Sequence, residues 1–335
     1  MTDRVIEAVG VSVRYPVPGG SWLSSRWLTA VDDVSLTLRA GETLGVVGES
    51  GCGKSTLGRA LLGLVKLHAG TIHLAGNRLD RASGERLRQM RRGIQMVFQD
   101  PLGSLDPRMT VGQSVAEPIE IYEPWLGRSE LRRRVGEALE RVGLDAGHAD
   151  RYPHEFSGGQ CQRIGIARAI VLRPRVVVCD EPVSALDVSI QGQVVNLLTG
   201  LQRDLGLAYL FISHNLAVVR HVSTRVLVMY LGRAVEQAPR DELYRRPLHP
   251  YTRALLDAVP STDPSRAAAP RAPLAGELPS PVEPPAGCVF STRCPLAQAR
   301  CHDTRPALVE AAAGHSVACH RWQEWPGGLT APGAS

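Results

Sequence analysis

The sequence predicts an α/β fold, because buried strands alternate with helices and a glycine-rich turn joins one such pair. Residues 43–47 form a continuous apolar run that predicts a strand, a glycine-rich turn follows, and residues 55–65 have the spacing of a helix. Residues 176–179 and 207–212 have the apolar composition of buried parallel strands, with a helical pattern over 188–204 between them. Alternating strands and helices of this kind form an α/β core.

Two regions differ from this core in their patterning. Between about residues 5 and 39, short runs of alternating apolar residues predict half-buried strands. Residues 100–173 contain few β-branched runs, and the segments 129–142 and 160–172 have helical spacing. We therefore expect a helical subdomain over about 100–173.

The composition is that of an ordinary globular protein. The 335 residues are 44% hydrophobic and 21% charged, and the net charge of +5 is spread among acids. This gives little support to a nucleic-acid partner, which favours stronger or more localised positive charge. No run approaches the roughly 18 to 20 apolar residues that span a bilayer. The N-terminus carries no apolar signal-peptide core, so we expect a cytoplasmic chain whose membrane role comes through partner subunits.

The C-terminal part has a composition of its own. Eight prolines between Pro260 and Pro285 predict a stiff, extended linker. A cluster of four cysteines follows, and in a reducing compartment such a cluster indicates a metal or iron–sulfur site more than two disulfides. These cysteines are Cys288, Cys294, Cys301 and Cys319.

The turn after the strand at 43–47 is predicted to be a phosphate-binding loop, with a plain glycine turn that ends in Lys-Ser as the alternative. Its sequence, Gly48–Ser55, fits the pattern G-x-x-x-x-G-K-[ST] in full. The glycines let backbone N–H groups point inward as a nest for phosphate oxygens, and the next helix adds its positive end. We expect Lys54 to contact the β- and γ-phosphates and Ser55 to ligate Mg²⁺. The remaining expected nucleotide-binding residues here are Gly48, Ser50, Gly51, Cys52, Gly53 and Thr56.

Five further motifs narrow the class, and with them the chain resembles the ATP-binding cassette (ABC) family. In chain order they are Gln99 as the Q-loop, Ser157-Gly158-Gly159-Gln160 as the signature, Val176 to Glu181 as the Walker B strand, Ser184 to Asp187 as the D-loop and His214 as the switch histidine. The resemblance implies an ABC-type P-loop ATPase core over about residues 1–250. It also implies an antiparallel β subdomain beside the helical one.

The resemblance implies catalytic roles for several side chains. Asp180, with Ser55 and Gln99, is expected to hold Mg²⁺ near the phosphates. Glu181 is placed to activate the attacking water as general base, although an acidic cap of a strand end is the alternative. His214 and Gln99 complete the expected catalytic set.

Other residues are expected to bind the nucleotide itself. Tyr15 resembles the aromatic residue that stacks on adenine, with a plain surface tyrosine as the alternative. Ser157 to Gln160 and Asp187 resemble residues that contact the nucleotide held by the opposite subunit. The implied enzyme is a dimer with two shared ATP sites. Cys161 departs from the positively charged residue often found after the signature glutamine, but the phosphate-facing residues are intact.

Several segments resemble the oligopeptide and dipeptide importer branch of the family. These are the insert from Tyr15 to about Ala30, the phosphate loop itself, Leu186 to Gln191, and His249-Pro250-Tyr251-Thr252. The resemblance implies ATP hydrolysis that drives uptake of di- and oligopeptides, at the cytoplasmic face of the inner membrane. Implied partners are a second ABC ATPase subunit in a heterodimer, two membrane permeases and an extracytoplasmic binding protein. Nickel or glutathione import is the alternative within the branch.

The tail of the chain resembles a cluster-binding extension found in several peptide-importer ATPases. We therefore expect residues 251–287 to form the linker and residues 288–335 a small cysteine-rich extension holding a [4Fe–4S] cluster on the four clustered cysteines. Zinc is the alternative metal, since His302, His315 or His320 could replace a thiolate. Four cysteines without any ligand are the remaining alternative.

Three rival classes share parts of this pattern. A DNA-repair or chromosome-maintenance ATPase would carry a coiled coil or zinc insertion between loop and signature, and that interval shows no heptad array. A translation-associated ATPase would have two cassettes in one chain, whereas this chain has one. A non-catalytic regulator would not need the full set Lys54, Asp180, Glu181 and His214.

Overall fold

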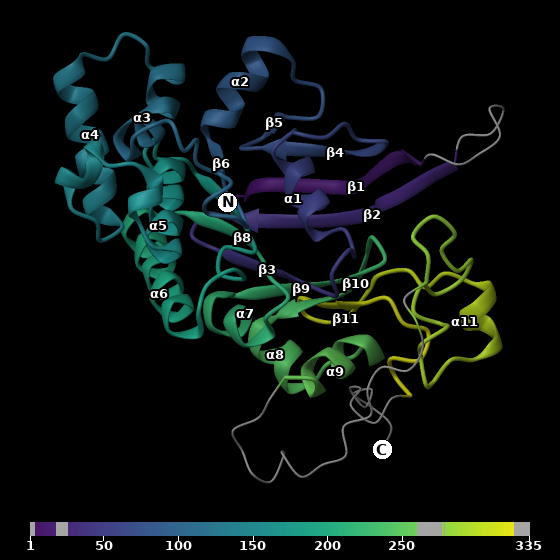
Figure 1. Cartoon of the computed structure of the whole chain (residues 1–335). Coiled ribbons are helices and arrows are strands. Elements are labelled where there is room, and N and C mark those ends of the chain that lie inside the picture. The colour runs from purple at the N-terminus through teal and green to yellow at the C-terminus, as the bar shows by residue number, and fades with distance from the viewer. Residues whose placement is uncertain (1–3, 18–25, 260–276, 278, 325–335) are drawn as a thin grey trace.

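The protein is built on two β-sheets, seen here in a computed structural model that describes residues 4–17, 26–259, 277 and 279–324 (Figure 1). The smaller sheet is antiparallel and has the strand order β2-β1-β4-β5. Its strands are β1 Arg4–Val17, β2 Arg26–Arg39, β4 Ala69–Leu74 and β5 Asn77–Arg78. The antiparallel β subdomain expected near the N-terminus is therefore present. Part of the expected insert, residues 18–25, lies outside the described residues.

The larger sheet has the order β11-β12-β10-β9-β3-β8-β7-β6 and is mixed. Strands β9, β3, β8, β7 and β6 are parallel, and β10, β12 and β11 continue the sheet in antiparallel pairing. Its strands are β3 Thr43–Val47, β6 Ile94–Val97, β7 Val176–Asp180, β8 Ala208–Ile212, β9 Arg225–Tyr230, β10 Arg233–Pro239, β11 Val309–Ala312 and β12 His315–Val317.

The core divides at the larger sheet because side chains of a strand alternate between its two faces. In β7, Val176 and Val178 pack with the smaller sheet and the first helix, whereas Val177 and Cys179 pack toward the helices on the other side. All four are buried, which explains the unbroken apolar run in the sequence. The α/β fold is confirmed.

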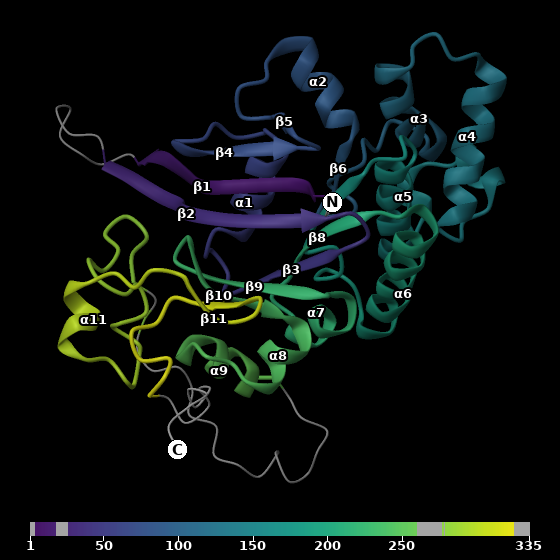
Figure 2. The ribbon, with the colours of Figure 1, turned by 180° about the vertical axis from the view of Figure 1, so that it is seen from behind.

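The helices lie on both sides of the larger sheet, and α3 to α6 gather at one end of the molecule (Figures 1 and 2). None in the described part of the chain is long and apolar enough to cross a membrane. They are α1 Lys54–Leu61, α2 Gly84–Arg92, α3 Val111–Tyr122, α4 Arg128–Arg141, α5 Gly158–Ile170, α6 Val188–Leu205, α7 Leu216–Val222, α8 Arg240–Arg245, α9 Pro250–Asp257 and α11 Ala299–Asp303, with short 3₁₀ turns at Ala146–Asp150 and Pro153–Glu155.

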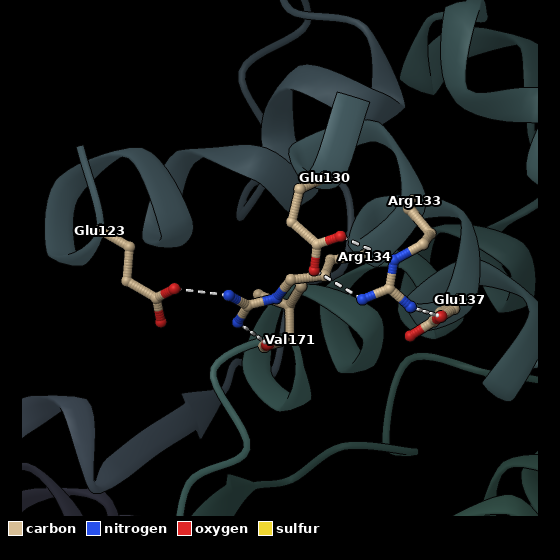
Figure 3. Close-up of polar contacts among 6 residues, drawn as sticks. All are labelled: Glu123, Glu130, Arg133, Arg134, Glu137 and Val171. Carbon is tan, nitrogen blue, oxygen red and sulfur yellow. Dashed lines mark hydrogen bonds and ion pairs between the residues drawn. The ribbon is translucent and has the colours of Figure 1, made fainter. Parts of the chain in front are cut away.

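An ionic network links the helical region to α2 and to the end of α5. The nearly buried Glu123 carboxylate pairs with Arg134 of α4 at 2.5 Å and with Arg92 of α2 at 2.5 Å. Arg134 also donates to the Val171 carbonyl at 3.1 Å (Figure 3). Arg133, in contrast, bridges Glu130 and Glu137 on the exposed face of α4 (Figure 3), where such pairs stabilise little.

The C-terminal residues continue the core and do not form a separate cysteine-rich body. Strand β12 pairs with β10, and β11 pairs with β12, so the tail extends the larger sheet. The buried His315 imidazole contacts the buried Glu236 carboxylate at 2.7 Å. Helix α9 occupies the first residues of the range 251–287 that we expected to be linker, because Tyr251 is buried in the core. Residues 260–276 and 278 of that range lie outside the described residues.

Candidate active site

The loop Gly48–Ser55 leaves the end of β3 and leads into α1, as the sequence predicts. Its backbone passes too close to other strands for side chains at two positions. A Cβ on Gly48 would lie 2.2 Å from the Met229 carbonyl oxygen, and one on Gly53 would lie 2.0 Å from the Ala30 carbonyl oxygen. Both glycines have positive φ, which other residues rarely adopt. The glycines therefore fix a tightly held loop in front of the α1 N-terminus.

Lys54 lies inside this loop and is almost completely buried. Its Nζ donates to the carbonyls of Gly48 at 2.8 Å and Glu49 at 2.9 Å, and lies 3.8 Å from the Cys52 Sγ. The ammonium is thus held by carbonyl dipoles, and none of these three contacts is with a carboxylate that would neutralise it. An anion entering the loop would find a buried, available positive charge.

Ser55 and Asp180 meet across the site. The Ser55 hydroxyl donates to Asp180 Oδ1 at 2.7 Å, which joins the first turn of α1 to the end of β7. Asp180 is buried, and this desolvation raises the pKa of its carboxyl, while the Ser55 hydrogen bond acts in the opposite direction. A bound cation would favour the ionised carboxylate at this position.

Glu181 receives two side chains from distant parts of the sequence. Gln99 Nε2 donates to Glu181 Oε2 at 3.2 Å, and His214 Nδ1 lies 3.3 Å from the same oxygen. The backbone of Glu181 has φ +47°, a left-handed conformation, and its N–H donates to the Ile212 carbonyl at 2.9 Å. Strained backbone of this kind is concentrated at functional sites. The three expected catalytic residues are therefore brought together.

These groups fit a nucleoside triphosphate bound to Mg²⁺. The buried Lys54 ammonium and the N-terminus of α1 suit phosphate oxygens. Asp180 and Ser55 supply the hard oxygen ligands that Mg²⁺ prefers. Gln99 donates to Glu181 from its amide nitrogen in this structure. Its amide oxygen is also a ligand of the kind that Mg²⁺ prefers.

The signature residues lie on a different part of the fold. Ser157 caps α5: its Oγ accepts from the Gln160 N–H at 3.3 Å, and Gln160 Oε1 accepts from the Ser157 N–H at 2.9 Å. Gly159 is needed for packing, because a Cβ there would lie 2.5 Å from Ile190 Cγ2 of α6. Ser157 and Gly158 are exposed at this helix N-terminus.

The other expected nucleotide contacts are placed as follows. Tyr15 is exposed on β1 and lies opposite Leu28 of β2. Leu28 precedes by two residues Ala30, whose carbonyl oxygen lies close to Gly53. Asp187 is exposed at the N-cap of α6. Ser50, Gly51, Cys52 and Thr56 belong to the loop and the start of α1, where Cys52 is buried.

The expectation of an iron–sulfur cluster in the tail is wrong. The thiols of Cys288, Cys294, Cys301 and Cys319 do line one small cavity, together with Phe290. Among the described residues, however, no group of three or more His, Cys, Asp or Glu side chains is arranged to hold a metal ion. The zinc alternative is excluded on the same geometry.

One contact to the phosphate loop was missed in the sequence. The Tyr251 hydroxyl accepts the Glu49 backbone N–H at 2.8 Å, although the two residues are far apart in the chain. From the sequence alone, the segment His249–Thr252 is typical of a family branch and has no evident physical role. The structure gives this segment a physical role, because Tyr251 holds the beginning of the phosphate loop.

Two family models match the chain. The model described as "ABC transporter" matches residues 31–184, and the model described as "Oligopeptide/dipeptide transporter, C-terminal region" matches residues 235–301. Together with the phosphate loop, Walker B strand and signature helix described above, the first match defines the chain as an ABC ATPase, an ATP-hydrolysing subunit of a transporter.

Curated relatives give the particular family. The chain is 55% identical to the oligopeptide transport ATP-binding protein OppF of Escherichia coli, over 94% of this chain and 95% of the relative. It is 50% identical to the di/tripeptide transport ATP-binding protein DppF of Pseudomonas aeruginosa, over 97% of this chain and all of the relative (100%). The chain belongs to the family of ATP-binding subunits of oligopeptide and dipeptide ABC importers.

Solved structures agree with the cassette fold. The dimer of the ATP-binding cassette MJ0796 in a post-hydrolysis state, bound to ADP and phosphate, is 27% identical with a TM-score of 0.63, covering 70% of this chain and 98% of that one. CbiO1 of Clostridium perfringens, part of the transporter complex cbiONQ, is 28% identical with a TM-score of 0.63, covering 72% of this chain and 91% of that one.

Proposed function

We propose that the chain hydrolyses ATP at composite sites of a cassette dimer and so drives uptake of di- and oligopeptides. The observation that carries this proposal is the convergence of Gln99 and His214 on one oxygen of Glu181, immediately after the Asp180 carboxylate that binds Ser55. A catalytic base, two groups that orient it and a cation-binding pair lie beside one phosphate loop. The peptide cargo is inferred from the family.

The loop is proposed to bind the phosphates of ATP. Its amides and the α1 N-terminus hold the phosphate oxygens, and Lys54 leaves the Gly48 and Glu49 carbonyls to contact the β- and γ-phosphates. Ser55, Asp180 and Gln99 would hold Mg²⁺, which neutralises charge on the transferred phosphoryl group. Tyr15 would stack on adenine.

Glu181 is proposed to be the general base. Its carboxylate would take a proton from the attacking water while that water approaches the γ-phosphate. Gln99 and His214 already contact the carboxylate, so they restrict its orientation before the substrate binds. His214 is largely exposed, with 57% of its side chain accessible, and is free to reach toward the γ-phosphate.

A second cassette is proposed to complete each site. Ser157 presents a hydroxyl, and Gly158 and Gly159 present first-turn amides, at the N-terminus of α5 beside Gln160, which suits the phosphates of a nucleotide bound by the opposite subunit. Asp187 would lie at the same interface. The similar cassette MJ0796 is a dimer in a post-hydrolysis state bound to ADP and phosphate, which supports dimerisation. The ATPase domain would cover residues 1–250, with the helical subdomain at about 100–173.

The assembly is proposed to be a heterodimer with a second ABC ATPase subunit. It would bind two membrane permeases at the cytoplasmic face of the inner membrane, and an extracytoplasmic binding protein would act indirectly. Family membership supports the permeases, and the heterodimer rests on the resemblance to the peptide-importer branch.

The test is Glu181→Gln. The amide keeps the shape and hydrogen bonding but cannot accept the proton, so ATP should still bind while hydrolysis falls by about two orders of magnitude or more. Turnover is measured with the membrane partners present, and ATP binding on the same preparation. Glu120→Gln, on the exposed face of α3, is the matched control. Near-normal turnover of the Glu181 variant would contradict the proposal.

A further inference from the structure

The tail of the chain forms an ion pair with the phosphate loop. Arg293 donates from Nη1 to Glu49 Oε2 at 2.7 Å and from Nη2 to Glu49 Oε1 at 3.1 Å. This bidentate geometry is the strongest form of an arginine–carboxylate contact. The pair is well shielded, with 8% of the Arg293 side chain and 27% of the Glu49 side chain exposed. The two residues are separated by 244 positions in the sequence.

Arg293 also contacts an aromatic side chain of the core. Its guanidinium lies 5.9 Å from the centre of the Tyr230 ring and 3.4 Å from that hydroxyl. Tyr230 packs edge-to-face on Tyr251 and on Phe290, with ring centres 4.7 and 5.3 Å apart. Tyr251 accepts the Glu49 N–H. The side chain and the backbone of one loop residue are therefore both fixed by the C-terminal residues.

Glu49 places a negative charge within the phosphate loop. The residue lies between Gly48 and Ser50 in a loop built to receive phosphates, and its carbonyl accepts from Lys54. A free carboxylate there would repel the nucleotide and compete for Lys54, and at partly buried positions such repulsion is weakly screened. The bidentate pair with Arg293 neutralises the Glu49 carboxylate, so its negative charge no longer acts on the loop.

We propose that Arg293 is a positioning residue for ATP binding: it neutralises and immobilises Glu49, so the C-terminal residues set the affinity of the phosphate loop. The inference rests on the proposed ATP site and adds a dependence of that site on the tail. Arg293 does not touch the nucleotide in this scheme and acts through Glu49.

The primary test is Arg293→Met in the full chain. Methionine keeps the apolar packing against Tyr230 and leaves Glu49 unpaired, so we expect binding of MgATP to weaken about tenfold. Affinity is measured by calorimetry at low and physiological salt, and folding is checked by thermal unfolding. Arg253→Met is the matched control, because Arg253 forms an exposed pair with Asp257 in the same part of the chain. Equal affinity of the Arg293 variant and the wild type would overturn the inference.

A second variant separates the effect of the unpaired Glu49 charge from the loss of support by the Arg293 side chain. In the double variant Arg293→Met with Glu49→Gln no carboxylate remains, and affinity should return to within about threefold of the wild type. Glu49→Gln alone should bind MgATP at least as tightly as the wild type, which tests the inference even if Arg293→Met fails to fold. A double variant as weak as Arg293→Met, or a weakened Glu49→Gln, would overturn it.

The outcomes also distinguish this inference from the proposed function. If the wild type binds no MgATP, the ATP site and the inference fail together. If the wild type binds MgATP, Lys54→Ala abolishes binding and Arg293→Met does not change it, the ATP site stands and the inference alone fails.

Discussion

Two glycines of the phosphate loop share a left-handed backbone but differ in their surroundings. Gly51 has φ +76° and a Cβ there would meet nothing within 4 Å, whereas Gly53 has φ +100° and its Cβ would lie 2.0 Å from the Ala30 carbonyl oxygen. The first residue is constrained by its backbone conformation alone. The second is constrained by that conformation and by close contact with β2.

We therefore predict unequal costs for alanine at the two positions. Gly51→Ala should lower the free energy of unfolding by about 1–2 kcal/mol, the cost of a left-handed non-glycine residue. Gly53→Ala should lower it by about 4 kcal/mol or more, because backbone must also move. Urea unfolding of both variants measures the difference. Equal losses would show that the loop adjusts around Ala30.

At the residue scale, local motifs could be predicted from the sequence and distant pairs could not. The phosphate loop is one short segment whose glycines, lysine and serine carry their own conformational requirements. The meeting of Gln99 with Glu181 spans 82 positions and was expected only through a family resemblance. Arg293 with Glu49 had no such guide, because neither a charge nor a spacing in the sequence identifies its partner.

At the scale of elements, helix α9 begins with a buried histidine. His249 Nδ1 accepts the Tyr251 N–H at 3.1 Å and so caps the helix. Burial lowers the pKa of His249 to about 4, and the nearby Glu236 carboxylate only partly offsets this. Protonation would turn the accepting nitrogen into a donor that faces another donor. The cap therefore requires the neutral imidazole.

This cap predicts a pH dependence of stability. The folded-state pKa lies below the unfolded value near 6.5, so protons bind the unfolded chain first, and the stability present above about pH 6.5 is lost toward pH 4. Between about pH 7 and pH 5 the loss should be about 2 kcal/mol. His249→Asn keeps a capping oxygen but cannot titrate, so its loss over this interval should be smaller by that amount.

The measurement is urea unfolding at the two pH values. His221→Asn, at an exposed position of α7, controls for the loss of a histidine as such. If His249→Asn loses as much stability on acidification as the wild type, the buried cap is not the titrating group.

Predicting elements succeeded where apolar periodicity is strong. The strand expected at 43–47 is β3, and the helical patterns at 129–142 and 160–172 correspond to α4 and α5 within two residues. Strands β11 and β12 were missed, because four and three residues are too short to establish a period of two. The iron–sulfur prediction is wrong because the number and spacing of the tail cysteines do not fix the directions of their sulfur atoms.

At the scale of the whole molecule, the two elements proposed to bind phosphates lie on different parts of one chain. The phosphate loop joins β3 to α1 beside the smaller sheet, whereas the signature Ser157 begins α5 in the group of helices at one end (Figures 1 and 2). The hydrogen bonds of Ser157 and Gln160 are with each other. This separation is what a site shared between two cassettes requires.

The last prediction follows from the proposed sharing of each site between two cassettes. The isolated chain should bind ATP through Lys54 yet hydrolyse it at least about tenfold more slowly than the assembled transporter, because the signature of a second cassette is missing. In the proposed heterodimer, adding the second ATPase subunit and the permeases should restore turnover. Mixing Lys54→Ala copies with Ser157→Arg copies of this chain should not restore turnover, since neither variant replaces the second ATPase subunit. A stable, fully active complex containing only copies of this chain would instead establish a homodimer.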